Sequence, residues 1–290
     1  MWREIGGLEF WQDEVLAASR TVVHAFTTRR GGLDWSPVAS LEPAGGSGGE
    51  AESAARNRQR ILGGLGLAGR LLVAAEQVHG AEVAVVDEGS CAAAAGPPGV
   101  QAEACAWVVP GADGLITQRQ DVCLSLCFAD CVPIFVTDTA GRFVGLAHAG
   151  WRGLAAGIPA YLVGAVRVAY GVPPADLLVA LGPAIGSCCY EVGEEVVASL
   201  EAACPGPSEQ WLKRGAARPY VDLRAVARAQ LLAAGAPAEQ VRVDQHCTAC
   251  DAERFFSHRR DAGRTGRMVA LMALMPDRVG GSHGALPDGR

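Results

Sequence analysis

Apolar and polar residues alternate along one central stretch of the chain, between positions 113 and 153, and this alternation predicts strands. Between residues 122 and 128, valine, leucine and phenylalanine occupy every second position, with cysteine or serine between them. A period of two is typical of a strand that presents different side chains to its two faces. Residues 132–136 are apolar, and residues 142–147 form a third expected strand after the Thr-Ala-Gly turn at 139–141.

Cys131 and His148 stand at the ends of these expected strands. Cys131 precedes the second strand, and His148 ends the third, directly before Ala-Gly-Trp-Arg-Gly. If the strands pair as a hairpin, the chain returns to its starting level and brings the two side chains together. A thiol and an imidazole on glycine-flanked strand ends indicate a functional site rather than core packing.

The rest of the chain alternates between expected strands and expected helices. The strands are predicted at 21–28, 71–75, 82–86, 176–181 and 268–274, and the helices at 52–62, 154–169, 191–203 and 223–234. Glycine-rich composition predicts a loop at 43–50 and an irregular insertion at 88–104. We expect an N-terminal segment at 1–20, a main domain at 21–276 and a flexible tail at 277–290.

Composition limits the classes of function. The chain has 290 residues and a net charge of −6, which argues against a general nucleic-acid surface. Its start resembles no signal peptide, and no apolar run reaches the ~18 residues that a membrane-spanning helix needs. We therefore expect a cytoplasmic protein with no membrane partner. With 10 cysteines and no export signal, free thiols, metal ligands or a nucleophile are favoured over a disulfide framework.

Two interpretations compete for the same candidate residues. His79, which lies in an expected connection between strands, can join Cys131 and His148 in a zinc site with one open position. Alternatively, Cys131 is a nucleophile, a histidine is its base, and Asp113 or Asp130 orients that base. Residue types alone leave both interpretations open.

A second group of cysteines carries less information. Cys247 and Cys250 form one CxxC motif, but a structural zinc site normally needs a second pair. We therefore interpret them as core or surface thiols, and the adjacent Cys188 and Cys189 are equally ambiguous.

Several motifs together resemble one family, the YfiH-like proteins, also called laccase-domain, polyphenol oxidase or peptidoglycan-editing-factor proteins. The matching stretches are HAFTTR at 24–29 with GG at 31–32, NR at 57–58, QVHG at 77–80, ADGLIT at 112–117, ADCVPI at 129–134, HAGWRG at 148–153, GPAIG at 182–186, CYEV at 189–192, FFSHRRD at 255–261 and RTGR at 264–267. The resemblance extends from about Val23 to Leu274, which is nearly the whole chain.

The resemblance implies a single α+β domain, a layered α-β-β-α sandwich, and a zinc site made by His79, Cys131 and His148, with copper as the alternative metal. It also implies purine nucleoside phosphorolysis, in which adenosine, inosine, guanosine or methylthioadenosine reacts with phosphate to give base and ribose 1-phosphate. Adenosine deamination accompanies this activity. Copper-dependent phenol oxidation and editing of peptidoglycan precursors are also attached to the family.

Phosphorolysis requires an anion site, and arginine supplies bidentate contacts to phosphate. Arg29, Arg58, Arg152, Arg264 and Arg267 are the candidates, and the sequence does not rank them. Asp113 is expected to be catalytic, either as an acid–base group or by orienting a metal-bound histidine.

Three other functions remain open at this point. A copper phenol oxidase needs many histidines for its copper cluster, and the chain has six. A hydrolase acting on a peptidoglycan precursor would use the same Cys/His site on an amide. A non-enzymatic binding protein would hold a structural zinc in a closed site of four ligands.

Overall fold

The structure is a computed structural model that describes residues 1–5, 7–30, 59–88, 106–214 and 218–276. Several sequence predictions lie outside these residues: Arg58, the loop at 43–50, nearly all of the insertion at 88–104, and the tail at 277–290. Most of the helix expected at 52–62 also lies outside them, whereas residues 59–64 are helical.

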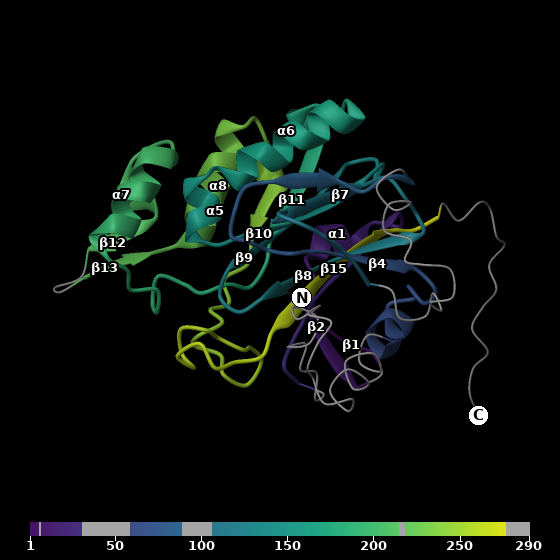
Figure 1. The fold of residues 1–290 in the computed structure, drawn as a ribbon, viewed down its shortest axis with the longest axis horizontal. Helices are drawn as coiled ribbons and strands as arrows, with labels where there is room; N and C mark the ends of the chain where they lie inside the picture. Colours follow the sequence, from purple (N-terminus) through teal and green to yellow (C-terminus); the bar gives the residue numbers. More distant parts are fainter. Residues whose placement is uncertain (6, 31–58, 89–105, 215–217, 277–290) are drawn as a thin grey trace.

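The fold is built on two mixed β-sheets (Figure 1). The first sheet contains, in spatial order, β1 (Trp2–Ile5), β2 (Leu8–Trp11), β3 (Val22–Thr27), β15 (Met268–Leu274), β8 (Val122–Phe128), β4 (Leu71–Ala75) and β6 (Ala106–Val109). The second contains β14 (Val241–Val243), β11 (Leu177–Leu181), β9 (Val132–Asp138), β10 (Val144–Ala149), β7 (Gly114–Thr117) and β5 (Val83–Val85). Parallel pairing occurs where β4 meets β6 and β8, where β11 meets β14, and where β5 meets β7.

The helices and a small hairpin complete the described fold. The α-helices are α1 (Glu14–Ala18), α5 (Trp151–Ala155), α6 (Ile158–Tyr170), α7 (Glu194–Ala203) and α8 (Leu223–Ala233), and the 3-10 turns are η2 (Pro174–Asp176), η3 (Ser208–Gln210) and η4 (Ala238–Gln240). Strands β12 (Leu212–Arg214) and β13 (Pro219–Val221) pair beside α7 at one end of the molecule (Figure 1). No helix in the described part of the chain has the length and apolar character needed to span a bilayer.

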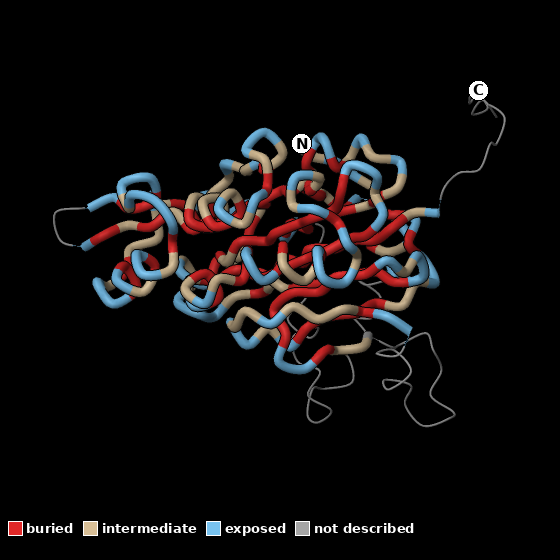
Figure 2. The backbone as a smooth tube through the Cα atoms, turned by 90° about the horizontal axis from the view of Figure 1, so that it is seen from above, coloured by how far each residue is buried: buried red, intermediate tan, exposed pale blue. Residues whose placement is uncertain are grey.

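Alternation along the strands separates the inner core from the outer faces. In β8, Leu124 and Leu126 pack into the core between the sheets, whereas Cys123 packs on the outer face of the first sheet. The alternating pattern predicted for residues 122–128 is therefore confirmed. Strand β15 is apolar on both faces because Ala270 lies between the sheets and Leu271 lies on the outer side. Figure 2 shows buried residues, in red, through the middle of the molecule, and exposed residues, in pale blue, mainly in the outer loops.

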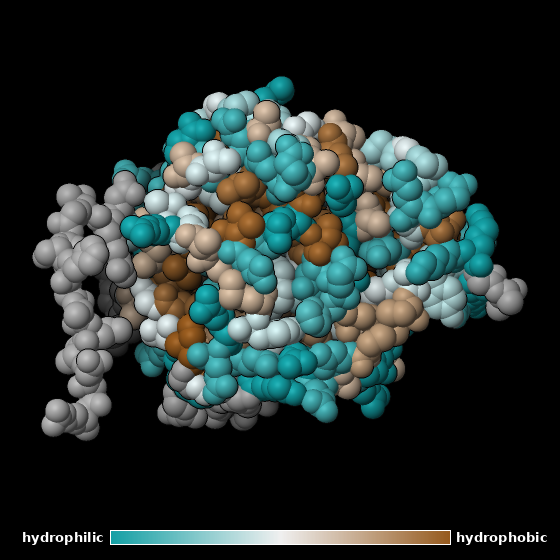
Figure 3. All heavy atoms as spheres, turned by 180° about the vertical axis from the view of Figure 1, so that it is seen from behind, coloured by the Kyte–Doolittle hydropathy of each residue, from teal (hydrophilic) through white to brown (hydrophobic). Residues whose placement is uncertain are grey.

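Helical layers cover both outer faces of the sheets. Helices α5, α6, α7 and α8 bury their apolar residues against the second sheet, as with Leu162 of α6 and Val226 of α8. On the other side, Ile61 of the helical residues 59–64 packs on the first sheet with Leu67 and Phe10. The predicted layered α-β-β-α arrangement is thus confirmed. The surface seen from behind is mainly hydrophilic, with hydrophobic residues near its middle and toward one side (Figure 3).

Two expected helix boundaries were wrong. The helix expected at 154–169 begins at Trp151 and is divided into α5 and α6, because Gly157 adopts a left-handed φ of +82° and Pro159 lies in the first turn of α6. The helix expected from Glu191 begins at Glu194, since Glu191 instead bridges to Tyr220. Residues 1–20 supply α1 and two strands of the first sheet.

The connections from β4 to β5 and from β8 to β9 each cross from the first sheet to the second. Residues 76–82 form one crossing and residues 129–131 the other. The crossings meet the end of β10 at one edge of the sandwich, and the candidate site lies there.

Candidate functional site

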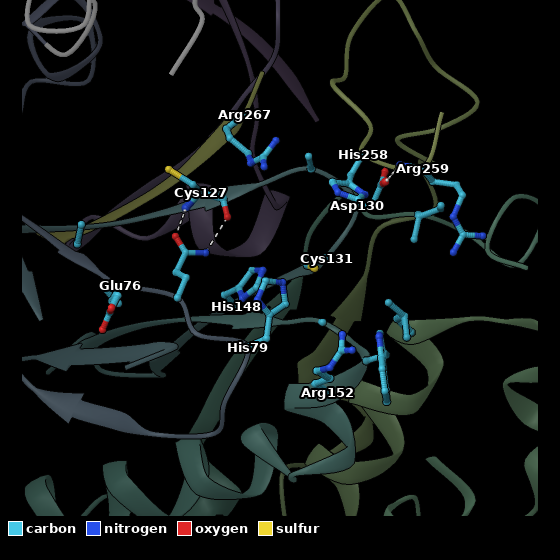
Figure 4. Close-up of a pocket in the computed structure, with 18 of the residues that line it drawn as sticks. Glu76, His79, Cys127, Asp130, Cys131, His148, Arg152, His258, Arg259 and Arg267 are labelled. Atoms are coloured by element: carbon cyan, nitrogen blue, oxygen red, sulfur yellow. Dashed lines mark hydrogen bonds between the residues drawn. The ribbon is translucent and has the colours of Figure 1, made fainter. Parts of the chain in front are cut away.

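His79, Cys131 and His148 meet at this edge and are called the His–Cys–His triad below. Pairing of β9 with β10 sets His148 opposite Pro133, which brings Cys131 close to the imidazole and confirms the predicted hairpin. One ligand atom of each triad residue lies within 4.8 Å of the others. The rings of His79 and His148 meet edge to face with their centroids 4.8 Å apart (Figure 4). Two imidazoles and one thiol match the donor set of a zinc site with an open position.

Asp113 forms hydrogen bonds to two members of the triad, His79 and His148. It is fully buried, and its Oδ1 lies 2.8 Å from His148 Nδ1. Its carboxylate also accepts the backbone N–H of His79 at 3.1 Å and that of Gly80 at 2.7 Å. A carboxylate on Nδ1 directs the other ring nitrogen, Nε2, to the ligand side. Asp113 is not among the residues that line the adjoining cavity, so its position supports an orienting role over direct acid–base contact with a substrate.

In the metal-free protein, Cys131 and His148 shift each other's pKa in opposite directions. Burial alone would raise the pKa of the Cys131 thiol, but the imidazoles of His148 and His79 outweigh burial and lower that pKa. Burial alone would lower the pKa of His148, but Cys131 and Asp113 raise it instead. Cys131 is therefore held as a thiolate, which is the form of cysteine that binds metal ions and acts as a nucleophile.

Strained backbone is concentrated in the two crossings. Gln77, His79 and Asp130 have φ values of +60°, +61° and +93°, a region that residues with side chains rarely adopt. The Gln77 amide is held on both sides, because Nε2 donates to Cys127 O and Oε1 accepts the Cys127 N–H, each at 2.8 Å. The Asp113 carboxylate accepts a hydrogen bond from the backbone N–H of His79. These hydrogen bonds offset the strain and fix the imidazole direction.

Asp130 fixes the segment on the other side of Cys131. Its Oδ1 accepts a hydrogen bond from the Thr248 hydroxyl at 2.6 Å, and its Oδ2 accepts one from the backbone N–H of Arg259 at 2.7 Å. The Asp130 carboxylate therefore links its own segment to the segments of Thr248 and Arg259. These partners differ from the histidine contact expected of a group that orients the triad. Of the two aspartates weighed from the sequence, Asp113 is the one in contact with His148.

Gly150 leaves the space in which the triad's atoms face one another. A Cβ at this position would lie 3.0 Å from Cys131 Sγ and 3.1 Å from His79 Cδ2. Such contacts are tighter than most in real proteins, so a larger residue would require the thiol or the imidazole to shift. The glycine of the HAGWRG motif therefore has a steric role at the site.

The triad opens into a cavity of about 890 Å³. Basic side chains line it around the triad, as Figure 4 shows: Arg152, His258, Arg259 and Arg267. The guanidinium of Arg152 stacks over the Trp151 ring at 4.3 Å. Apolar residues, including Val108, Ile185 and Leu223, also line the cavity, together with the acidic Glu76 and Asp130. A cavity with a cationic side and apolar walls suits a ligand that carries both an anion and a flat apolar group.

The arginines proposed from the sequence differ in whether they line the cavity. Arg152 and Arg267 line the cavity, whereas Arg29 and Arg264 are not among its lining residues. Arg29 instead donates to Ala252 O at 3.2 Å and stacks over the Phe256 ring. Arg58 lies outside the described residues.

Sequence reasoning missed His258 and Arg259 as cavity residues. They fall inside the matched stretch that begins at Phe255, which was the available signal. Motif membership alone could not show which of its neighbouring basic residues face the cavity.

The four cysteines interpreted as unrelated thiols are brought together. Cys188 and Cys189 meet Cys247 and Cys250, and all four Sγ atoms lie within 4.8 Å of one another. The CxxC motif therefore does not stand alone, because a second pair of thiols comes from a loop about sixty residues earlier in the chain. These residues are called the four-thiol cluster below.

Fold and site together define a class: a two-sheet α/β protein whose sheet-crossing loops carry one thiol and two imidazoles at the mouth of a basic cavity. A family model described as "Multi-copper polyphenol oxidoreductase laccase" matches residues 23–275. The chain belongs to this laccase-domain family, which includes the YlmD and YfiH proteins.

Known relatives cover most of the chain. It is 41% identical over 251 residues to "Purine nucleoside phosphorylase YlmD" of Geobacillus stearothermophilus, a match that covers 86% of this chain and 89% of the relative. It is 30% identical over 256 residues to the protein of the same name from Bacillus subtilis, covering 88% and 90%. The crystal structure of the Geobacillus stearothermophilus YlmD superposes with a TM-score of 0.79 at 38% identity, covering 94% of this chain and 98% of that one.

Proposed function

We propose that the protein is a zinc-dependent purine nucleoside phosphorylase that also deaminates adenosine. The observation that carries this proposal is the meeting of the His–Cys–His triad with a cavity lined by Arg152, Arg259 and Arg267. Relatives at 30% and 41% identity are named purine nucleoside phosphorylases, which supports the substrate class.

The donor set fits a zinc ion. His79, Cys131 and His148 would hold it, and the carboxylate of Asp113 fixes the His148 ring by its 2.8 Å contact with Nδ1. When bound with one position open, zinc polarises an oxygen and lowers the pKa of a bound water toward ~7. That chemistry suits deamination, because replacing the amino group at C6 of adenosine requires an activated water.

Phosphorolysis makes further demands on the protein's own residues. A phosphate oxygen bonds to C1′ of the ribose as the bond from C1′ to the purine breaks, and the purine leaves as the free base after taking up a proton. Arg152, Arg259 and Arg267 bind and orient the phosphate dianion through charge-assisted hydrogen bonds. His258 is the candidate donor of the proton, and the apolar wall near Ile185 and Leu223 receives the purine.

A multi-copper oxidase is less compatible with these residues. In the described part of the chain, the triad is the one cluster of potential metal ligands that contains histidine, and it has two imidazoles. A cluster of several coppers would need more imidazoles in reach of one another.

The test is to incubate metal-defined protein with inosine or adenosine, with and without phosphate, and to identify the products. Inosine should be cleaved only with phosphate, giving hypoxanthine and ribose 1-phosphate, whereas adenosine should be deaminated in either condition. Release of free ribose without phosphate would overturn the phosphorylase assignment, and oxygen uptake with a phenol as the sole activity would favour the oxidase.

The arginines allow a sharper experiment. Replacing Arg152, Arg259 or Arg267 by Ala should raise the KM for phosphate by about tenfold or more, since a hydrogen bond to a charged group contributes about 1.5–3 kcal/mol. Deamination of adenosine should change little. Arg29→Ala is the matched control, because Arg29 lies outside the cavity lining.

A further inference from the structure

The four-thiol cluster lies between two loops on the second sheet. Cys188 and Cys189 belong to the loop that follows β11, and Cys247 and Cys250 belong to the loop that follows β14. These strands are parallel neighbours, so both loops leave the sheet at the same edge. The Sγ of Cys250 lies 3.5 Å from that of Cys188 and 3.4 Å from that of Cys189.

The spacing of the sulfur atoms suits one tetrahedral ion. Zinc binds thiolates at about 2.3 Å, which places neighbouring sulfurs of a tetrahedral site roughly 3.8 Å apart. The pairs at 3.4 and 3.5 Å, and the 4.8 Å limit on all pairs, bracket this separation. Four cysteines complete the coordination of zinc and leave no open position, which is typical of a structural site.

The backbone of Gly186 lies close to the sulfur atoms of the cluster. The N–H of Gly186 donates to the Sγ of Cys247 at 3.2 Å, an interaction that favours the ligating thiolate form. A Cβ on Gly186 would lie 3.2 Å from Cys188 Sγ and 3.5 Å from the Cβ of Cys247, so a side chain there would crowd Cys188 and contact Cys247. The amide of Gly186 therefore contacts a thiol of one loop, and the missing side chain leaves room for a thiol of the other.

The two loops also form part of the wall of the candidate site. Ala184 pairs with Cys247 as an isolated bridge, and the Thr248 N–H donates to Ala184 O at 3.2 Å. Thr248 then binds Asp130 next to Cys131, and Tyr190 beside Cys189 lines the cavity. An ion that joined the loops would consequently hold one wall of the cavity in place.

We propose that Cys188, Cys189, Cys247 and Cys250 form a second, structural zinc site that joins the loops after β11 and β14 and stabilises one wall of the cavity. This site shares no residue with the His–Cys–His triad. It supplies four ligands to its ion, whereas the triad supplies three.

The test is a count of zinc per chain in protein purified under reducing conditions with zinc present. Cys250→Ser and Cys188→Ser should each remove one zinc relative to the unaltered protein. Cys204→Ser is the matched control, because Cys204 is a thiol outside both clusters, and it should leave the zinc count unchanged. Cobalt substitution identifies the site: the intense thiolate-to-cobalt absorption of a four-sulfur site should survive in Cys131→Ser and disappear in Cys250→Ser.

Two results would overturn the proposal. One is an unchanged zinc count and cobalt spectrum in Cys250→Ser. The other is a disulfide within the cluster in the unaltered protein, found by alkylating the freshly isolated chain without reductant and mapping its peptides. This second measurement needs no variant, so it decides the question even if a substitution prevents folding.

Discussion

The His–Cys–His triad and the four-thiol cluster are both groups of metal-competent side chains, yet they are built differently. The triad sits at strand ends and sheet crossings, opens into the cavity, and is supported by the buried carboxylate of Asp113. The four-thiol cluster sits on two loops, includes the exposed Cys188 and Cys250, and contributes no residue to the cavity lining. Three ligands beside a cavity suit chemistry, whereas four thiols between loops suit structural support. Ligand number and access to the cavity therefore distinguish the two sites more clearly than residue type does.

Removing a triad ligand should have the largest effect on activity. Cys131→Ser and His148→Ala should lower both phosphorolysis and deamination by more than the ~10–100-fold that loss of an outer hydrogen-bond partner costs. Steady-state rates with inosine and with adenosine provide the measurement. Cys204→Ser is the matched thiol control. If phosphorolysis survived in full, the triad would have no part in that reaction.

Removing the support behind the triad should have the next largest effect. Asp113→Asn keeps the shape of the side chain but removes the negative charge beside His148 and one of the oxygens that accept backbone N–H groups. We expect activity or zinc affinity to fall by ~10–100-fold. Zinc competition with a chromophoric chelator measures the affinity directly. Equal affinity and equal rates in the variant would show that the carboxylate serves folding alone.

Crowding the triad should have a smaller effect. Gly150→Ala places a Cβ 3.0 Å from Cys131 Sγ, and overpacking of this kind costs about 1–3 kcal/mol. Zinc affinity should therefore fall by about tenfold or more if the triad bears that strain. Gly164→Ala in α6 is the control, since a Cβ there meets nothing within 4 Å and alanine favours a helix. Two variants with the same zinc affinity would contradict the close packing around the triad.

The smallest effect concerns thiol reactivity in the metal-free protein. Because the pKa of Cys131 is lowered, its thiolate should persist as the pH falls below the usual thiol range, and its alkylation should fade only below the lowered pKa. Burial raises the pKa of Cys123 and Cys127 to about 12, so these thiols should stay unreactive at neutral pH. Peptide mapping after iodoacetamide treatment over a pH series distinguishes them.

Asp113→Asn tests the cause of this reactivity. Without the carboxylate, the pKa of His148 should fall and the pKa of Cys131 should rise, which moves the onset of alkylation to higher pH. An onset that stayed in place would show that Asp113 does not support the charged pair.

Local patterns predicted part of this structure, and distant contacts determined the rest. The period of two in β8 depends on neighbouring residues, so it could be recognised from the chain alone, and so could the hairpin that joins Cys131 to His148. The break at Gly157 was missed because the apolar pattern continues across it, and only the left-handed φ reveals the division.

The candidate site needed more than periodicity. No local spacing links His79 to the hairpin, so residue types made it only a candidate ligand, and the family resemblance strengthened that assignment. The four-thiol cluster was missed because its halves come from different loops, which only the parallel pairing of β11 with β14 brings together. The arginines also remained unranked until the cavity separated Arg152 and Arg267 from Arg29.

The most direct test of the triad as the reactive centre is phosphorus NMR of inosine turnover in phosphate buffer. The unaltered protein should consume one phosphate for each hypoxanthine released and form ribose 1-phosphate. Cys131→Ser should form almost none, whereas Cys204→Ser should match the unaltered protein. Hypoxanthine release without loss of phosphate, or full formation of ribose 1-phosphate by Cys131→Ser, would contradict the assignment.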